Sequence, residues 1–295
     1  MRVTFNQLRD GLDQINSAAE RFTEAQWQVS TGLRNRALSN DPAASQRAVL
    51  EQATIDSLDA YTSVSGSASH RLAALDSTLG NIGDKITAAL TALQSSIGTT
   101  ATQPVRDAAA VTFQGLREAI AADINSTLDG TRLFGGTGPN VDPYARVSGT
   151  WTYQGTNQAV TVAIGPNRNV AITADGQSIL QGSDAADVLS VLDGLATAAQ
   201  SNDRTTLLAG LDQLKNAFSR ANTAQSHVGY DEASVADASD RLTTLRSAAT
   251  ARLSSDRDVN MAEALTRMSQ AQTAYQAALG AVAASSKLSL MDYIK

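Results

Sequence analysis

The sequence predicts a mainly α-helical protein with a small β insert. In this fold the two chain ends form a long antiparallel helical bundle or coiled coil, and an antiparallel β-domain is inserted in the middle. Two observations predict the helices: apolar residues alternate at spacings of three and four at both ends, and again between residues 72 and 93. A third observation predicts the insert, because glycine, proline and short β-type runs gather between residues 130 and 182. A repeat of 3.5 residues is typical of a coiled-coil seam.

The two ends carry the clearest seams. The N-terminal seam consists of Phe5, Leu8, Leu12, Ile15, Ala19, Phe22, Gln26, Val29 and Leu33. The C-terminal seam consists of Met261, Leu265, Met268, Gln272, Tyr275, Leu279, Val282 and Ser286. All of these except Ala19, Gln26, Gln272 and Ser286 are the predicted assembly residues. We expect the two end helices to pack on each other or on copies of themselves. Because the apolar burial of one such seam barely offsets the backbone entropy of its helix, we expect the ends to need neighbouring subunits.

Helices are also predicted between the ends. Asp41 is the expected N-cap of a long helix that has Pro42 at its first position and continues through Leu93. A turn at Pro104 precedes a helix over residues 113–128. Beyond the insert, helices resume at Asp184 as an expected N-cap and run through residues 189–195, 207–218 and 232–249.

The insert is marked by its composition. Nine of the 20 glycines and three of the five prolines fall in residues 130–182, with β-type runs at 150–154, 159–164 and 170–173. Three domains are therefore predicted. Residues 1–45 plus 255–295 form a terminal coiled-coil domain, 46–129 plus 184–254 form a long-helix bundle, and 130–183 form an inserted β-domain.

Composition argues against several functions. The chain has no cysteine, two histidines and a net charge of −6, so we expect no catalytic site, no metal site and no nucleic-acid partner. His70 lies in a long helix and His227 in a predicted polar turn before Gly229, where a solvated or packed histidine is the better interpretation. The glycine-rich run at 135–138 lacks the lysine of a phosphate-binding loop, so no cofactor is expected. The longest apolar run, 277–284, is too short to cross a membrane, and the first residues lack the apolar core of a secretory signal.

Both ends resemble a known family. The run from Gln28 to Arg34 (QVSTGLR), followed by Ser39-Asn40-Asp41-Pro42-Ala43-Ala44-Ser45, is similar to an element of the flagellin superfamily, although Asn40 replaces the usual aspartate. The run QTAYQAAL from Gln272 and the ending LSLMDYI from Leu288 resemble the ends of the proteins that join the bacterial flagellar hook to the filament, the hook-associated protein 3 group. In the middle, Leu133-Phe134-Gly135-Gly136-Thr137, Pro143-Tyr144 and Tyr153-Gln154-Gly155 are similar to runs in the same group.

The resemblance implies a non-enzymatic adaptor of the flagellar axial structure. It implies terminal helices that line an inner tube, long helices in a second shell and an outward β insert. Implied partners are copies of the chain itself in a ring, the first hook-associated protein, flagellin, and an export chaperone on the C-terminal helix at about residues 255–295. It also implies an extracellular location in the flagellum, reached through the type III route without a cleaved signal peptide.

Three alternatives remain open. A filament flagellin shares the N-terminal element but usually lacks an ending such as Met291-Asp292-Tyr293-Ile294 and the Tyr153-Gln154-Gly155 run. A cytoplasmic coiled-coil scaffold would account for the seams but not for the β insert. An enzyme is the weakest alternative, because the sequence offers no acid–base or metal cluster.

Overall fold

The computed structural model of the chain describes residues 2–138 and 141–293, and the side chains of all of these except 2–8, 38 and 285–293. It divides into two compact units, one made of Met1–Ser57 with Leu245–Lys295 and the other of Leu58–Thr244. Long helices dominate both units, and the short strands all lie in the second. The predicted fold class, mainly helical with antiparallel strands in the middle, is confirmed.

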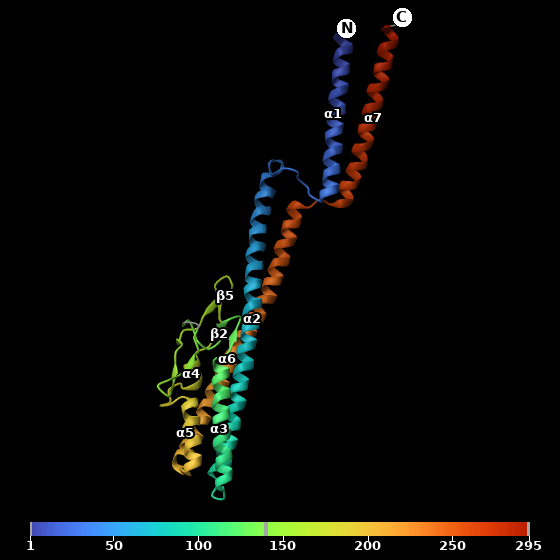
Figure 1. Cartoon of the computed structure of the whole chain (residues 1–295). Helices are drawn as coiled ribbons and strands as arrows, with labels where there is room; N and C mark the ends of the chain where they lie inside the picture. Colours follow the sequence, from blue (N-terminus) through green and yellow to red (C-terminus); the bar gives the residue numbers. More distant parts are fainter. Residues whose placement is uncertain (1, 139–140, 294–295) are drawn as a thin grey trace. The chain divides into compact units, whose positions relative to one another are not determined.

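The first unit contains the two ends of the chain. Helices α1 (Arg2–Thr31) and α7 (Met261–Tyr293) lie side by side and antiparallel, with the two termini at the same end of the pair (Figure 1). A short 3-10 helix, η1 (Leu38–Asn40), follows α1. The beginning of α2 (Pro42–Ile97) and the end of α6 (Arg204–Arg257) complete this unit, and both helices continue into the second.

The core of the second unit lies among its helices. The predicted line on α2 is buried along its whole length, and its members are Leu72, Leu75, Leu79, Ile82, Ile86, Ala89 and Leu93. These side chains share one hydrophobic cluster with α3 (Gln103–Ile124), α5 (Val188–Ser201) and α6. Phe113 of α3 and Leu192 of α5 are fully buried in it. The spacing of three and four therefore predicted this core correctly.

Helix starts agree with the sequence at one place and differ at another. Asp41 caps α2 as predicted, since its Oδ1 accepts a hydrogen bond of 2.9 Å from the Ala44 N–H, and Pro42 is the first helical residue. The prediction that Asp184 is an N-cap is wrong. Helix α5 begins at Val188 and is capped by Asp187, whereas the Asp184 carboxylate pairs with Arg220 at 2.5 Å. Asp184 lies three positions before the true cap and pairs with Arg220 of α6, a contact that the sequence alone does not reveal.

One predicted break does not exist. Helix α6 runs without interruption through His227 and Gly229, where the sequence predicted a polar turn. Val228 is buried against the core of the second unit, so tertiary packing holds the helix through the glycine.

The strands form three separate antiparallel hairpins rather than one sheet. They pair β1 (Thr127–Leu128) with β2 (Thr131–Arg132), β3 (Tyr144–Val147) with β4 (Thr150–Tyr153), and β5 (Thr161–Gly165) with β6 (Arg168–Ala171). The predicted runs at 150–154, 159–164 and 170–173 correspond to β4, β5 and β6, while β1 to β3 were missed. Their turns rest on left-handed residues such as Ser148 and Gly149, the pair that closes β3 on β4. A one-turn helix, α4 (Gly176–Leu180), follows with Asp175 as its N-cap.

The hairpin segment shares the core of the surrounding helices. Phe134, Tyr144, Ile164 and Val170 are buried in the same cluster as the α2 line. Arg71 of α2 donates a hydrogen bond of 2.7 Å to the Ile172 carbonyl. Strands and helices of this unit therefore hold each other in place. The finer division into 46–129 plus 184–254 and a β-domain of 130–183 remains a prediction of the sequence.

A pair of substitutions in this shared core should act in opposite ways. Phe134→Ala should lower the free energy of unfolding by about 3–5 kcal/mol, because it removes a fully buried ring. Tyr144→Phe should be neutral or stabilising, because the buried Tyr144 hydroxyl has no hydrogen-bond partner among the residues that the structure describes. Denaturant melts followed by circular dichroism measure both. A Phe134→Ala variant as stable as the wild type would show that the hairpin segment does not support the helices.

Candidate assembly surface on the terminal helices

Helices α1 and α7 meet along a regular heptad seam. Among the described side chains, the buried and half-buried positions of α1 that repeat at this spacing are Gly11, Ile15, Ala18, Phe22, Ala25 and Val29. Those of α7 are Ala264, Met268, Ala271, Tyr275, Ala278 and Val282. In both helices the steps alternate between four and three residues, as in a coiled coil.

Small residues bring the two helices close together. One row of each seam contains only glycine and alanine, and the other row contains the bulky side chains. A Cβ atom on Gly11 would lie 2.8 Å from Cγ2 of Val282, so the backbone of α1 passes directly over that valine. The rings of Phe22 and Tyr275 stack with their centroids 6.4 Å apart. Each bulky side chain is therefore accommodated by a small position, which limits how much apolar surface the pair buries.

Some of the predicted assembly residues lie in the seam, and others are exposed beside it. Ile15, Phe22, Val29, Met268, Tyr275 and Val282 are half-buried members of the seam. Leu12, Met261, Leu265 and Leu279 are exposed, with 42–50 % of their surface accessible. Leu33 is half-buried just beyond the end of α1. The side chains of Phe5 and Leu8 lie outside the described residues. The small seam members were not predicted, because glycine and alanine contribute little to an apolar pattern. They are Gly11, Ala18, Ala25, Ala264, Ala271 and Ala278.

One side of the helix pair carries the exposed residues Leu12, Leu265 and Leu279, together with half-buried Ala19 and the exposed amides of Gln26 and Gln272. Leu12, Ala19 and Gln26 each follow a small seam residue by one position, and so do Leu265, Gln272 and Leu279 on α7. In an antiparallel pair, positions that follow the seam by one residue lie on the same side of both helices. We call this side, with these six residues, the open apolar side.

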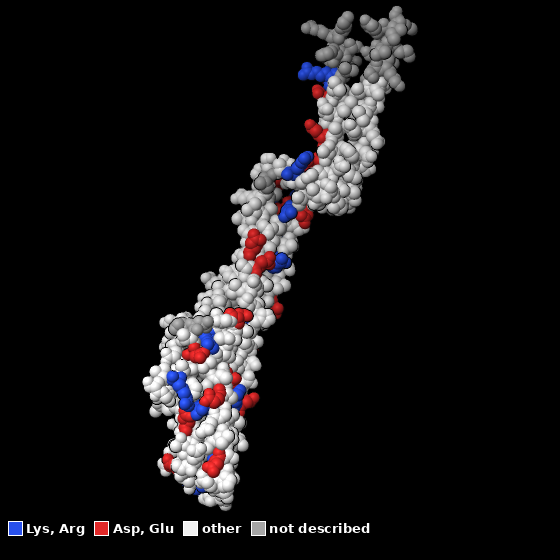
Figure 2. Space-filling view, in the orientation of Figure 1, with Lys and Arg blue, Asp and Glu red and all other residues white. Residues whose placement is uncertain are grey.

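The opposite side of the pair is polar. Shallow hollows on that side are lined by charged and amide side chains, among them Glu20, Arg21, Gln28 and Arg267. Residues 268–286 of α7 contain no charged side chain on any face of the helix, and the part of α7 visible in Figure 2 is correspondingly almost white. The helix pair thus has one side suited to water and one suited to a partner helix.

The two chain segments beside the pair are joined by backbone hydrogen bonds. Helix α1 ends at Thr31, and Gly32 follows with a left-handed φ of 71°, which favours glycine. The Arg34 N–H then donates to the Arg257 carbonyl at 2.8 Å, and the Val259 N–H donates to the Gly32 carbonyl at 2.9 Å. This two-bond ladder ties the chain leaving α1 to the chain entering α7.

Three residues of the QVSTGLR run, Gln28, Gly32 and Arg34, have structural roles here. The Gln28 amide donates to the Arg34 carbonyl at 2.8 Å and closes the loop around Gly32. The Arg34 guanidinium donates to the Ser255 carbonyl of α6. Gln28, Gly32 and Arg34 therefore fix the path of the chain at this point.

Ion pairs join the first turns of α2 to the last turns of α6. Arg47 contacts Asp256 at 2.7 Å, and Arg252 contacts Glu51 at 2.8 Å. The hydrogen bond from Arg47 lowers the pKa of the Asp256 carboxyl below its ordinary value, and the bond to Glu51 raises the pKa of the Arg252 guanidinium. Both shifts favour the charged forms of Asp256 and Arg252, although such exposed pairs contribute little to stability.

No group of three or more histidine or acidic side chains within the described ranges could hold a metal ion. Among the helices that the structure describes, none combines the length and the apolar character needed to cross a bilayer. Over the second unit, acidic and basic side chains alternate on the face drawn in Figure 2.

Known families match both parts of the chain that form these helices. The family model of the bacterial flagellin N-terminal helical region matches residues 4–138. That of the bacterial flagellin C-terminal helical region matches residues 211–294, which include α7. The chain belongs to the flagellin superfamily. Among curated proteins, none matches this flagellin-superfamily chain significantly.

Solved structures with the same fold are flagellar proteins. A Vibrio parahaemolyticus protein described as a flagellar hook-associated protein superposes with a TM-score of 0.69 at 16% identity, over 74% of this chain and 100% of its own. FlgL from Xanthomonas campestris gives a TM-score of 0.63 at 16% identity, over 69% of this chain and 99% of its own. The flagellar junction protein FlgL from Legionella pneumophila gives 0.52 at 11% identity, over 73% and 99%. At these identities the likeness establishes a shared fold.

Charging the seam should release the terminal helices. We expect limited proteolysis of the wild type to trim residues 1–45 and 255–295 first, because a single helix pair is a marginal structure. Ala25→Asp places an unpaired charge at a position only 6% exposed, so trimming should need at least severalfold less protease. Gln26→Asp, on the exposed neighbouring position, is the matched control and should behave as the wild type. Equal sensitivity of the two variants would show that the seam is not packed in solution.

Proposed function

We propose that this chain is a structural adaptor subunit that joins the bacterial flagellar hook to the filament. The observation that carries the proposal is the open apolar side of the terminal helix pair, which lies in the two regions matched by the flagellin family models. A helix pair that leaves leucines exposed on one side is incomplete as an isolated structure and suited to packing against further helices.

Copies of the same chain are the first expected partners. The open apolar side and the polar side are different surfaces, so a contact that joins one subunit to the next need not be self-complementary. Such head-to-tail contacts generate rings or helical arrays. A ring of copies built around the terminal helices is therefore the proposed form of assembly, with the predicted assembly residues at its contacts.

The junction is favoured over the filament by the similar structures. Their names describe hook-associated and junction proteins. The ending Met291-Asp292-Tyr293-Ile294 and the Tyr153-Gln154-Gly155 run point the same way. A filament flagellin is the second candidate, favoured by the fact that the two family models describe flagellin regions in general.

Further partners follow from a place at the junction. The first hook-associated protein would contact one end of the ring and flagellin the other. An export chaperone would cover the C-terminal helix, about residues 255–295, before assembly, since this helix exposes apolar leucines. Export would follow the flagellar type III route to an extracellular position, and the role would be structural rather than enzymatic.

Deletion of the gene separates the two candidates. Loss of a junction subunit should abolish filaments while flagellin is still secreted, as measured by electron microscopy and by flagellin in the culture medium. Loss of a filament subunit should remove that protein from the medium and leave the other exported proteins in place. Normal filaments in the deletion strain would contradict both.

A charge on the open apolar side should block assembly without unfolding the protein. Leu265→Asp or Leu279→Asp would bury an unpaired carboxylate in the proposed contact, so cells should export the variant but lose motility. Ala277→Asp, on the exposed side of α7 that faces away from the seam, is the matched control and should remain motile. The melting temperature of the second unit should be unchanged in all three. A drop in that temperature would mean that the leucines belong to an ordinary core.

A further inference from the structure

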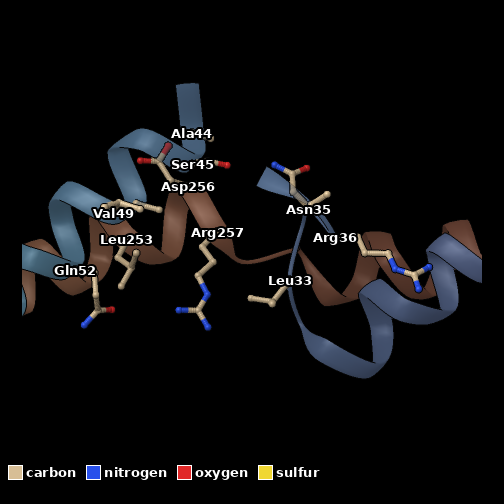
Figure 3. A pocket seen from close by; sticks show the side chains of 12 residues that line it. Leu33, Asn35, Arg36, Ala44, Ser45, Val49, Gln52, Leu253, Asp256 and Arg257 are labelled. Carbon is tan, nitrogen blue, oxygen red and sulfur yellow. The ribbon is translucent and has the colours of Figure 1, made fainter. Parts of the chain in front are cut away.

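A pocket lies beside the two-bond ladder of the first unit. It has a volume of about 400 Å³ and is lined by side chains from the segment after α1, from the first turns of α2 and from the last turns of α6 (Figure 3). Leu33, Ala48, Val49 and Leu253 supply its apolar surface. Val49 is 63% exposed although it lies on a helix that is paired with another, so nothing in the described chain covers this side of the pocket.

The rim of the pocket is polar and positively charged. Arg36 and Arg257 line it, and neither forms an ion pair among the described residues, because Asp256 is taken by Arg47. Asn35 also lines it, with a side-chain amide that makes no hydrogen bond to any described residue. An apolar pocket with two uncompensated cations and a free amide suits an aromatic side chain that has a polar tip and acidic surroundings.

The chain itself contains such an element. Tyr230 of α6 is 75% exposed, the largest fraction among the large apolar side chains that the structure describes. It lies in the stretch 221–240, which has four carboxylates, Asp231, Glu232, Asp237 and Asp240, and no lysine or arginine. Only Asp237 of these forms an ion pair with a described residue, Arg168.

The glycine before this tyrosine adds a second observation. Gly229 lies inside a helix, where glycine costs stability relative to alanine. A Cβ atom at this position would meet no atom within 4 Å, so no packing within the described chain requires the glycine. Its absence of a side chain leaves the helix backbone beside Tyr230 open to close approach by another molecule.

We propose that the pocket at Val49 receives Tyr230 of a second copy of this chain. The ring fills the space between Val49 and Leu253, the phenol reaches the Asn35 amide, and the acidic stretch faces Arg36 and Arg257. The inference rests on the proposed function, since it needs copies held side by side. Donor and acceptor are different surfaces of one chain, so each subunit can give its tyrosine to one neighbour and receive another's.

Cysteine pairs test the contact directly, because the chain has no cysteine of its own. Val49→Cys and Ser226→Cys are introduced singly into two gene copies that are expressed together in the source organism. Ser226 is exposed and lies one helical turn before Tyr230, so the tyrosine itself stays in place. Oxidation of isolated flagella should then yield a disulfide-linked dimer of the two variants, since a bond forms only when the Cα atoms lie about 4.4–6.8 Å apart. Two separate chains carry the cysteines, so the product can only be intermolecular.

The control replaces Ser226→Cys by Val111→Cys, a residue 68% exposed on α3, and should yield no dimer with Val49→Cys. Ala48→Trp, which fills the pocket, should reduce the dimer yield at least tenfold in the presence of the first pair. Equal yields with Val111→Cys, or a yield unchanged by Ala48→Trp, would overturn the contact. Absence of the dimer in flagella with normal filaments would overturn the contact and leave the proposed function standing. Normal filaments after deletion of the gene would instead overturn the proposed function.

Discussion

The close pairing of α1 with α7 is the constraint on which the function depends. Two helices can bury only one side of each other, and here glycine and alanine occupy half of the seam positions, so the backbones approach closely but little apolar area is covered. The leucines that would extend the core stand one position outside the seam and stay exposed. A wider bundle would bury them, but the chain supplies no third helix to the described part of this pair. We propose that other molecules complete it, which would tie the stability of the ends to assembly.

The two units illustrate different uses of the same periodicity. In the second unit the line from Leu72 to Leu93 meets α3, α5 and α6 and is buried throughout, so the spacing of three and four produces an ordinary core. In the first unit the same spacing produces a seam flanked by the open apolar side. What differs is the number of helices that pack around each apolar line, and the spacing of apolar residues does not predict that number. The hairpins add to the second unit by placing Phe134 and Tyr144 into the core, while Arg71 ties α2 to their carbonyls.

The sequence predicted the helical class, the place of the strands and the cap at Asp41, because apolar period, turn residues and capping residues are local signals. It did not predict the cap at Asp187, because Asp184 is an equally good capping residue by type and only the fold shows that it pairs with Arg220. It did not predict a continuous α6, since buried Val228 offsets the cost of Gly229. At the candidate site the sequence identified the bulky residues, but it could not tell that Phe22 lies in the seam and Leu12 beside it. That distinction depends on the glycine and alanine positions of the seam, which give a weak apolar signal. Such a difference appears only when the partner helix is in place.

The joint beside the pair links the family motif to the proposed contacts. Gly32 turns the chain, Gln28 closes the loop, and Arg34 reaches α6. These three residues of the QVSTGLR run thus hold the place where the chain leaving α1 passes the chain entering α7. That crossing has a consequence for charge. Arg47 and Arg252 are paired with acidic residues across the helices, whereas Arg36 and Arg257, beside an apolar pocket, form no ion pair with any residue that the structure describes. A fold that satisfied only its own subunit would gain from pairing these cations or from covering Val49. Two such cations beside an open pocket support the proposal that a neighbouring copy completes the packing of this subunit.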